Sequence, residues 1–254
     1  VMNNINKIKN YWNKRAKSKF YKCTNDLNLQ EKEFEILLDI IKPNKSILDI
    51  GCGDGMLLKK LAKIKKISGL GLDYSKELIN EANKNKVKNI EFKCLDMRSL
   101  KKENNKTYDY IITKRSIQNL TKWSYQKMVI DNLHLFSKKK SRILLIESSS
   151  TALENINIVR EKLKLKKIVK PWHNLYLDDK KIIKTKFKNI RLLEIKELFS
   201  TYYFISRTLN AALAEKKKKV PKYNDILNII GWRLPQNIIR NFSQLKLYEF
   251  KKIK

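Results

Sequence analysis

The sequence is poor in the residues that most often mark special chemistry: its 254 residues include six glycines, four prolines, three cysteines and two histidines. Cys23, Cys52 and Cys94 are widely spaced and form neither a disulfide framework nor a zinc-ligand pattern. No apolar run approaches the about 18 residues of a membrane-spanning helix. Residues 1–20 lack the apolar centre of a signal peptide. We therefore expect a soluble, cytoplasmic protein without a bound metal ion.

Acidic residues are also scarce, and the formal net charge is +32. Such a charge invites a nucleic-acid partner, because cations release counterions from phosphates. However, only nine of the 57 basic residues are arginines, and Lys, Asn and Ile are all abundant, which is typical of AT-rich coding. The lysine runs at 138–140 and 216–219 are therefore predicted to be solvated surface. Arginines kept against this bias are candidates for specific roles: Arg15, Arg98, Arg115, Arg160, Arg207 and Arg233.

Hydrophobic periodicity predicts strands that alternate with helices. Helices are expected at 4–22, 25–42, 56–64, 75–83, 124–136 and 151–165. Strands are expected at 46–50, 67–72, 89–95, 108–113, 142–147, 195–205 and 245–250. This order predicts a Rossmann-like, doubly wound, mostly parallel seven-stranded sheet with helices on both faces. We expect a single domain with a helical cap (2–42), a core (43–150) and a C-terminal part with helical insertions (151–254).

Five of the six glycines fall at positions 51, 53, 55, 69 and 71. The segment 49–55, Asp-Ile-Gly-Cys-Gly-Asp-Gly, joins a predicted strand to a predicted helix, which places backbone N–H groups beside a ligand. Asp73 follows Gly53 by 20 positions, where an acidic residue can bind ribose hydroxyls. A dinucleotide site would have G-x-G-x-x-G, and the carboxylate of Asp49 would repel a pyrophosphate. A carboxylate at this position suits a cationic ligand, and this favours S-adenosylmethionine over NAD.

Residues 45–148 resemble the core of class I S-adenosylmethionine-dependent methyltransferases. The resemblance implies that Asp49 and Gly51 hold the methionine portion and that Asp73 binds the ribose diol, with Gly53 and Tyr74 also among the cofactor-binding residues. Asp96 and Met97 would then meet the adenine, and Lys114, Arg115 and Ser116 would line the sulfonium side. An N-terminal helix closes over the cofactor in similar enzymes, so Tyr11 and Arg15 join the expected cofactor-binding residues. A packing role for Tyr11 and Trp12 remains open.

The acceptor side contains the candidate catalytic residues His173, Glu147 and Arg115. Methyl transfer to a hydroxyl requires removal of a proton. Glu147, at the end of the fifth predicted strand, or His173, in the loop region after that strand, could accept this proton. The other histidine, His134, lies among apolar residues and is expected to be structural. The expected substrate-binding residues combine arginines with polar side chains: Arg115, Arg160, Tyr202, Tyr203, Arg207 and Asn174. This set predicts an anionic acceptor, although ordinary ion pairing remains an alternative for each arginine.

The C-terminal half resembles methyltransferases of bacterial surface-polysaccharide gene clusters, including those that serve O-methyl phosphoramidate decoration of capsules. The segments that carry this resemblance are 114–120, 156–160, 172–178, 202–207 and 231–235. It implies O-methylation of a sugar or a phosphorus-linked group on a small, nucleotide-activated intermediate. Two alternatives remain open at this point. One is an RNA methyltransferase, and the other is a non-enzymatic protein held at a membrane surface by its lysine-rich helices.

Overall fold

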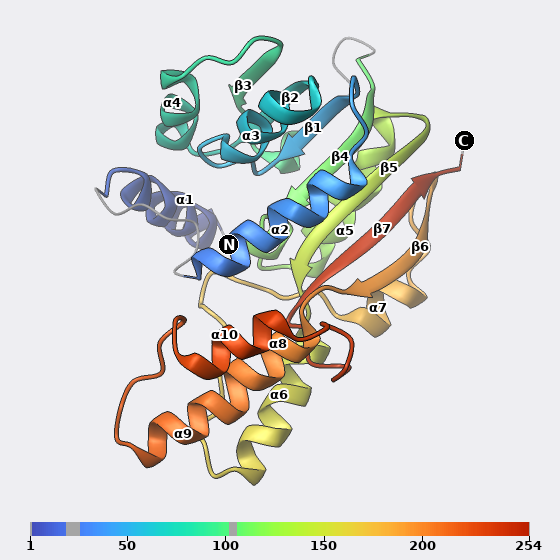
Figure 1. Ribbon diagram of the computed structural model, residues 1–254. Helices are drawn as coiled ribbons and strands as arrows, with labels where there is room; N and C mark the ends of the chain where they lie inside the picture. Colours follow the sequence, from blue (N-terminus) through green and yellow to red (C-terminus); the bar gives the residue numbers. More distant parts are fainter. Residues whose placement is uncertain (1, 19–25, 102–105, 254) are drawn as a thin grey trace.

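The computed structural model describes residues 2–18, 26–101 and 106–253. Its centre is a seven-stranded sheet of order β3-β2-β1-β4-β5-β7-β6 (Figure 1). The strands are β1 (Ser46–Ile50), β2 (Ser68–Asp73), β3 (Ile90–Cys94), β4 (Tyr108–Lys114), β5 (Ser137–Ser148), β6 (Ile190–Glu197) and β7 (Leu245–Lys252). The first five strands pair in parallel, and β7 runs antiparallel to both β5 and β6. The predicted Rossmann-like, mostly parallel sheet is confirmed.

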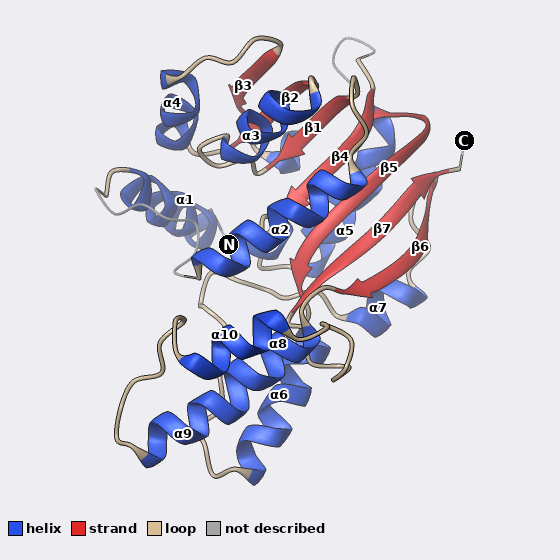
Figure 2. Cartoon of the chain, in the orientation of Figure 1, coloured by secondary structure: helices blue, strands red, loops and turns tan. Residues whose placement is uncertain are grey.

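Helices cover both faces of this sheet (Figure 2). They are α1 (Met2–Ala16), α2 (Leu27–Ile40), α3 (Met56–Lys65), α4 (Lys76–Lys84), α5 (Trp123–Asn132), α6 (Ser150–Lys162), α7 (Asp179–Lys184), α8 (Ser200–Phe204), α9 (Asn210–Lys216) and α10 (Ile226–Arg233). A π-helical turn, Ile205–Leu209, connects α8 to α9. The helices α6, α8, α9 and α10 form a lobe beyond the carboxyl end of β5 (Figure 1). No helix in the described ranges combines the length and apolarity needed to cross a membrane.

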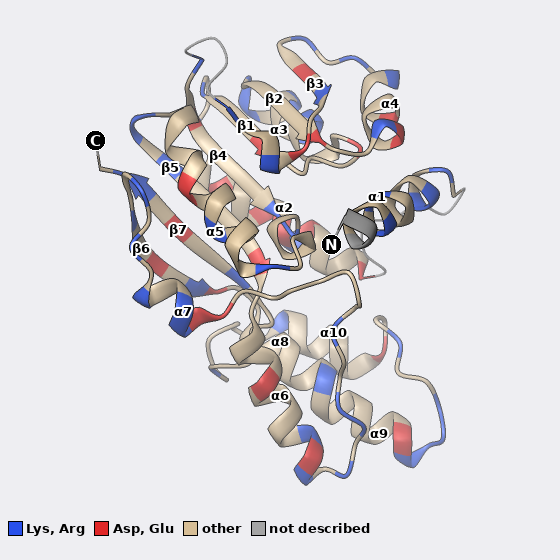
Figure 3. Ribbon diagram, turned by 180° about the vertical axis from the view of Figure 1, so that it is seen from behind, with Lys and Arg blue, Asp and Glu red and all other residues tan. Residues whose placement is uncertain are grey.

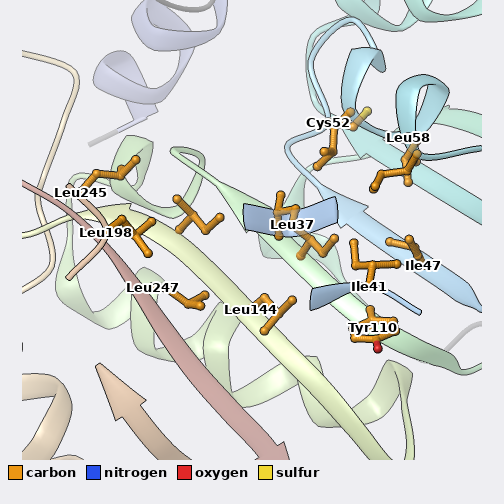
Figure 4. Close-up of a cluster of buried hydrophobic side chains, with 14 of the residues drawn as sticks. Leu37, Ile41, Ile47, Cys52, Leu58, Tyr110, Leu144, Leu198, Leu245 and Leu247 are labelled. Atoms are coloured by element: carbon orange, nitrogen blue, oxygen red, sulfur yellow. The ribbon is translucent and has the colours of Figure 1, made fainter. Parts of the chain in front are cut away.

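Alternate residues of each central strand point to opposite faces, and this divides the core into two layers. One layer contains Ile47, Tyr110 and Leu144 and packs against α2 and α3 (Figure 4). The other contains Leu48 and Ile111 and packs against α5 and α7. Central strands buried on both sides therefore read in the sequence as continuous apolar runs.

The strand expected at 195–205 is wrong from residue 198 onward, and the observed strand begins earlier than expected, at Ile190. β6 ends at Glu197, and α8 begins at Ser200. The hydroxyl of Ser243 accepts hydrogen bonds from the N–H groups of Leu198 and Phe199, which ends the strand ladder. Tyr202 and its neighbour in sequence, Tyr203, are both buried, because this helix is surrounded by protein. Aromatic and β-branched residues favour strands intrinsically, but tertiary packing overrides that preference here.

The N-terminal cap also differs in its details from the expectation. The helix expected at 4–22 ends at Ala16, and residues 19–22 of that prediction lie outside the described residues, as does Cys23. The second helix begins after Asp26, whose carboxylate accepts from the N–H of Leu29 and so caps it. The other oxygen of Asp26 accepts from the hydroxyl of Tyr202 at 2.5 Å. This buried contact ties the cap to the C-terminal lobe.

Candidate functional site

The glycine-rich turn follows β1 directly and has a left-handed backbone at three positions. The φ angles are +78° at Gly51, +58° at Gly53 and +74° at Gly55. The N–H of Gly51 donates to the carbonyl oxygen of Leu72 at 2.7 Å, which fastens the turn to β2. A Cβ added at Gly51 would lie 2.2 Å from the Cβ of Ser116. The turn can therefore approach the 114–116 segment only with glycine at position 51.

A cavity of about 1190 Å³, measured out to its open mouth, lies above this turn. Acidic side chains from the carboxyl ends of three adjacent strands line it: Asp49, Asp73 and Asp96. Further lining residues come from α1, α2, α5 and the ends of β2, β3 and β4 with the loops that follow them: Ile5, Ile8, Trp12, Gln30, Tyr74, Met97, Arg98, Lys114, Arg115, Ser116, Asn119, Thr121 and Tyr125. Ligands of α/β proteins bind at this edge of the sheet, where the strand order reverses.

Asp49 is the most deeply buried acid of the cavity, with 2% of its surface exposed. Burial raises its pKa to about 7, and the carboxylates of Asp73 and Asp54 add to the rise while the Lys114 ammonium opposes it. A buried carboxylate that ionises near neutral pH gains strongly from a positive charge beside it. The position therefore favours a cationic ligand group.

Asp73 accepts hydrogen bonds from backbone groups on both of its carboxylate oxygens. The N–H of Gly53 donates to one carboxylate oxygen at 3.0 Å, and the N–H of Ser75 donates to the other at 2.9 Å. Burial raises the pKa of Asp73, and these backbone donors moderate the rise. Each oxygen has a second lone-pair direction for a donor on a ligand. The hydroxyl of the neighbouring Tyr74 is buried without a hydrogen-bond partner among the described residues.

Asp96 begins a short 3₁₀ turn, Met97–Ser99, and forms a bidentate pair with Arg98. Burial raises the pKa of Asp96, but the hydrogen bonds from the Arg98 side chain and backbone outweigh it and bring the pKa below its usual value. The carboxylate is therefore ionised at neutral pH. Asp96 and Met97 both line the cavity, on the side where adenine is expected.

Lys114 and Arg115 bound the opposite end of the cavity. Both pair with Glu33 of α2, since Oε2 of Glu33 lies 3.0 Å from Nζ of Lys114 and 3.1 Å from the guanidinium of Arg115. Glu33 is fully buried, and its Oε1 has no hydrogen-bond partner among the described residues. Arg115 has a φ of +53°, a strained conformation that recurs at functional sites.

Glu147 does not line the cavity, although it was a candidate base. Its Oε1 accepts from the Thr113 hydroxyl at 2.8 Å and from the N–H groups of Ser116 and Ile117 at 3.1 and 3.0 Å. Its Oε2 accepts from the N–H of Gln118 at 3.3 Å. The carboxylate thus lies beneath the 114–118 segment and holds it in place. Burial raises its pKa to about 7, although these donors lower it.

We predict that Glu147→Gln flattens the pH dependence of stability. Because the folded-state pKa is raised, the contribution of Glu147 to the free energy of unfolding is full below pH 4.5 and lost as the pH rises through about 7. Between pH 5 and pH 8 the wild type should lose roughly 2–3 kcal/mol more than the variant. Urea unfolding at both pH values measures this difference. Glu154→Gln, at an exposed position of α6, should keep the wild-type slope, and an equal slope in both variants contradicts the prediction.

Tyr11 and Trp12 of α1 pack against His173, which lies in the loop after α6. The ring centroids of Tyr11 and His173 are 4.5 Å apart, and the Trp12 and His173 rings meet edge to face at 5.8 Å. Trp12 lines the cavity, whereas His173 lies one side chain behind it. Nε1 of Trp12 donates to Oδ1 of Asn119 at 3.3 Å. Arg15 lies near both aromatic rings of the helix, 5.9 Å from the centroid of Tyr11 and of Trp12.

His173 and Asn174 each have a buried polar atom without a hydrogen-bond partner among the described residues, Nδ1 and Oδ1 respectively. Burial lowers the pKa of His173, and the positive charge of Arg15 lowers it further. The imidazole is therefore neutral at pH 7 and can accept a proton. Two adjacent buried polar atoms that lack partners are unusual in a folded protein and point to a missing ligand atom or water.

The remaining expected substrate-binding residues lie in the C-terminal lobe and not in the cavity lining. Tyr202 stacks on Trp232, with the ring centroids 3.7 Å apart. The guanidinium of Arg207 lies 5.6 Å from the ring centroid of Tyr203, and both Arg207 and Arg115 are close enough to oppose the rise of the Tyr203 pKa that burial causes. Arg160 donates to the carbonyl oxygens of Lys166 and Arg207. Arg160 therefore links α6 to the π-helical turn within the lobe.

Several cavity residues were missed by sequence reasoning. Gln30 lines the cavity from α2, and Glu33 of the same helix pairs with the lining residues Lys114 and Arg115; on a helix, an amide and an acid resemble ordinary surface residues. Asn119, Thr121 and Tyr125 follow β4, and their position after a strand end could have identified them. The thiol of Cys52 is buried beside the carboxylates of the turn, and burial raises its pKa well above the usual value, as expected for a structural residue. No group of three or more metal-ligating side chains occurs within 2–18, 26–101 and 106–253.

Comparisons with known proteins identify a family and a fold for this chain. Residues 41–197 match a family of methyltransferase domains. A ubiquinone biosynthesis O-methyltransferase from Coxiella burnetii is 34% identical over 96 residues, which are 37% of this chain and 39% of the relative. The match thus spans well under half of the curated relatives that it identifies.

Solved structures share the fold over nearly the whole chain. The N-methyltransferase NodS from Bradyrhizobium japonicum, in complex with S-adenosyl-L-homocysteine, superposes with a TM-score of 0.59 at 10% identity and covers 97% of this chain and 99% of its own. The methyltransferase component of a complex with the Haloferax volcanii Trm112 methyltransferase activator gives a TM-score of 0.59 at 12% identity, covering 95% and 97% of the two chains. At these identities the likeness shows the fold alone.

Proposed function

This chain belongs to the family of methyltransferase domains, and from that premise we propose that it transfers the methyl group of S-adenosylmethionine to an oxygen atom of a small anionic acceptor. The observation that carries the proposal is the cavity that Asp49, Asp73 and Asp96 line together.

The described residues fit S-adenosylmethionine, the methyl donor of this family. Asp49 supplies a buried negative charge for the cationic amine and sulfonium, and Asp73 has lone pairs left for the two ribose hydroxyls. A Cβ at Gly51 would lie closer than 3.0 Å to Ser116, and a Cβ at Gly71 closer than 3.0 Å to Phe92 and Cys52. Glycine at both positions therefore allows the turn and β2 to pack closely at the base of the cavity. The donor, when bound, supplies an electrophilic methyl group on a positively charged sulfur.

For the acceptor, we propose the side of the cavity that Lys114 and Arg115 bound. Both cations pair with the buried Glu33, which holds their side chains at this end of the cavity. Arg207 adds a third cation near Tyr203. Arginine binds phosphate and carboxylate groups in a bidentate manner, which gives orientation as well as affinity. Asn174 would accept a hydrogen bond from the acceptor through its unpartnered Oδ1.

Methyl transfer is an in-line displacement, so the protein has to align the acceptor oxygen and remove its proton. We propose His173 as the proton acceptor, because its lowered pKa keeps it neutral and its Nδ1 is unpartnered. Since Trp12 separates it from the cavity, the proton would reach it through a water molecule or a shift of α1. Glu147 is proposed as a positioning residue that holds the backbone of Ser116, Ile117 and Gln118.

Oxygen as the acceptor atom is supported by the O-methyltransferase relative. The resemblance of the C-terminal half to enzymes of surface-polysaccharide clusters supports a sugar- or phosphorus-linked acceptor, such as a nucleotide-activated phosphoramidate. The runner-up is an RNA methyltransferase. It would show transfer to RNA with steep salt dependence. The non-enzymatic alternative disagrees with the family of the chain.

Transfer of labelled methyl groups tests the proposal. Small sugar phosphates and phosphoramidates should accept label from S-adenosylmethionine, and RNA should not. His173→Ala should lower kcat by about 100-fold or more, the usual contribution of a general base, while the Kd of the cofactor stays unchanged. His134→Gln is the control, because the other histidine lies at the far end of α5, in Leu133–Phe136. Full turnover in His173→Ala removes the assignment of the base, and label in RNA alone removes the assignment of the acceptor.

A further inference from the structure

Exposed apolar side chains are concentrated in the C-terminal lobe. They include Val220, Ile226, Ile230 and Leu234. Val220 is 82% exposed and Ile226 is 66% exposed. Single exposed apolar residues are ordinary, but a continuous group of them usually marks an interaction surface. The most exposed of these residues lie in the loop between α9 and α10 and along α10.

We define the 216–234 strip as that loop together with α10. On α10, Ile226 and Ile230 lie four residues apart and therefore share one face, and the exposed Leu234 follows directly after the helix ends at Arg233. The opposite face, with the buried Asn228 and Gly231, packs against α8 and the π-helical turn. The exposed row thus faces away from the protein. The loop projects at the outer edge of the lobe (Figure 1).

The same strip is strongly basic. Lysines occupy positions 216–219 and 222, all exposed, and they flank Val220 on both sides. Figure 3 shows these basic positions along the loop beside α9. Within this loop, Asp225 is the single acidic residue, and its carboxylate accepts from the Asn210 amide and from the N–H of Lys222. Charge and exposed apolar surface therefore coincide in one short segment.

Three kinds of partner differ in how well they match this combination. A second copy of the chain, also at +32, would bring like charges together. A nucleic acid would pair with the lysines but leave Val220 and Ile226 in contact with phosphates or water. An anionic lipid surface satisfies both, because its phosphates meet the lysines and its acyl region receives the aliphatic side chains.

We propose that the 216–234 strip binds the surface of an anionic lipid membrane. The lysines contact the headgroups, and Val220 and Ile226 enter the boundary between headgroups and acyl chains. The lobe that bears the strip also contains Arg207, so binding would turn the proposed acceptor side towards the membrane. The inference concerns a separate surface and stands whether or not the proposed acceptor is correct.

Sedimentation of the full chain with vesicles tests the proposal. At physiological salt the wild type should bind vesicles that contain phosphatidylglycerol, and not vesicles of phosphatidylcholine alone. Val220→Ser combined with Ile226→Ser should raise the half-saturating lipid concentration at least tenfold. Lys217→Ser combined with Lys218→Ser should raise it by a similar factor, since each lysine at an anionic surface contributes about fivefold.

Matched controls distinguish the strip from general charge and general apolarity. Lys139→Ser with Lys140→Ser removes two exposed lysines elsewhere, and Ile64→Ser with Ile183→Ser removes two exposed isoleucines elsewhere. Both controls should bind vesicles as the wild type does. Every variant should keep the thermal midpoint and the affinity for S-adenosylmethionine, which shows that it is folded. The proposal is overturned by an absence of binding to anionic vesicles, by equal loss in the controls, or by RNA that competes the protein off the vesicles through the same lysines.

Discussion

Replacing Asp73 with alanine is expected to weaken binding of S-adenosylmethionine by at least about 100-fold. The proposed ribose contacts are two hydrogen bonds to a carboxylate, each worth roughly 1.5–3 kcal/mol when one partner is charged. The same substitution leaves the N–H groups of Gly53 and Ser75 without their acceptor, which loosens the turn that the cofactor contacts. Both effects act in the same direction. Calorimetric titration of folded protein measures the loss.

The matched control for this prediction is Glu77→Ala. Glu77 lies in the first turn of α4, close to Asp73 in sequence, but its side chain pairs with Lys17 at the surface. It should bind the cofactor as the wild type does. A thermal midpoint for each variant separates unfolding from loss of a contact. If Asp73→Ala is folded and keeps the wild-type affinity, Asp73 does not bind the ribose.

Binding of S-adenosylmethionine is expected to weaken as the pH falls below 7, by about tenfold for each pH unit. The reason is Asp49, whose pKa burial raises to about 7 in the protein without ligand. A cationic ligand favours the ionised carboxylate, so binding at lower pH requires release of a proton. Asp49→Asn should remove this dependence and should weaken binding at pH 8 by roughly 10- to 100-fold, the loss of a charge-assisted contact.

Asp49→Asn should raise the stability of the folded protein at pH 8, although it weakens binding of S-adenosylmethionine. A buried acid with a raised pKa contributes stability below its ordinary pKa of 3.8 and loses it as the pH rises through about 7. The variant should therefore unfold at a higher urea concentration than the wild type at pH 8. S-adenosylhomocysteine, which lacks the sulfonium charge, should show a shallower pH dependence than S-adenosylmethionine. Equal slopes for the wild type and the variant would show that another group titrates.

Parts of the fold could be predicted from the sequence because local pattern and tertiary structure agree there. The first five strands are short apolar runs separated by amphipathic helices, and a parallel sheet with right-handed crossovers follows from that order. The region from 195 to 240 could not be predicted in the same way. Tyr202 and Tyr203 favour a strand locally, yet Ser243 and Trp232, which are distant in sequence, direct the chain into a helix.

The candidate site divides along similar lines. Asp49, Asp73 and Asp96 each lie at or just beyond the end of a parallel strand, and such ends share one edge of the sheet, so their convergence on one cavity follows from the strand order. Glu33 gave no such signal. Its partner Lys114 is 81 positions away, and a lone glutamate on a helix resembles a solvent-exposed residue. Contacts of this kind depend on how α2 packs, which periodicity alone does not determine.

The central claim is that the turn at 49–55 and Asp73 together bind S-adenosylmethionine. The most direct test is calorimetric titration of the wild type at pH 8 with S-adenosylmethionine and, separately, with NAD. We predict saturable binding of one S-adenosylmethionine per chain, competed by S-adenosylhomocysteine and lost in Asp73→Ala, with no heat from NAD. Binding of NAD in place of S-adenosylmethionine, or saturable binding that Asp73→Ala leaves intact, would contradict the account.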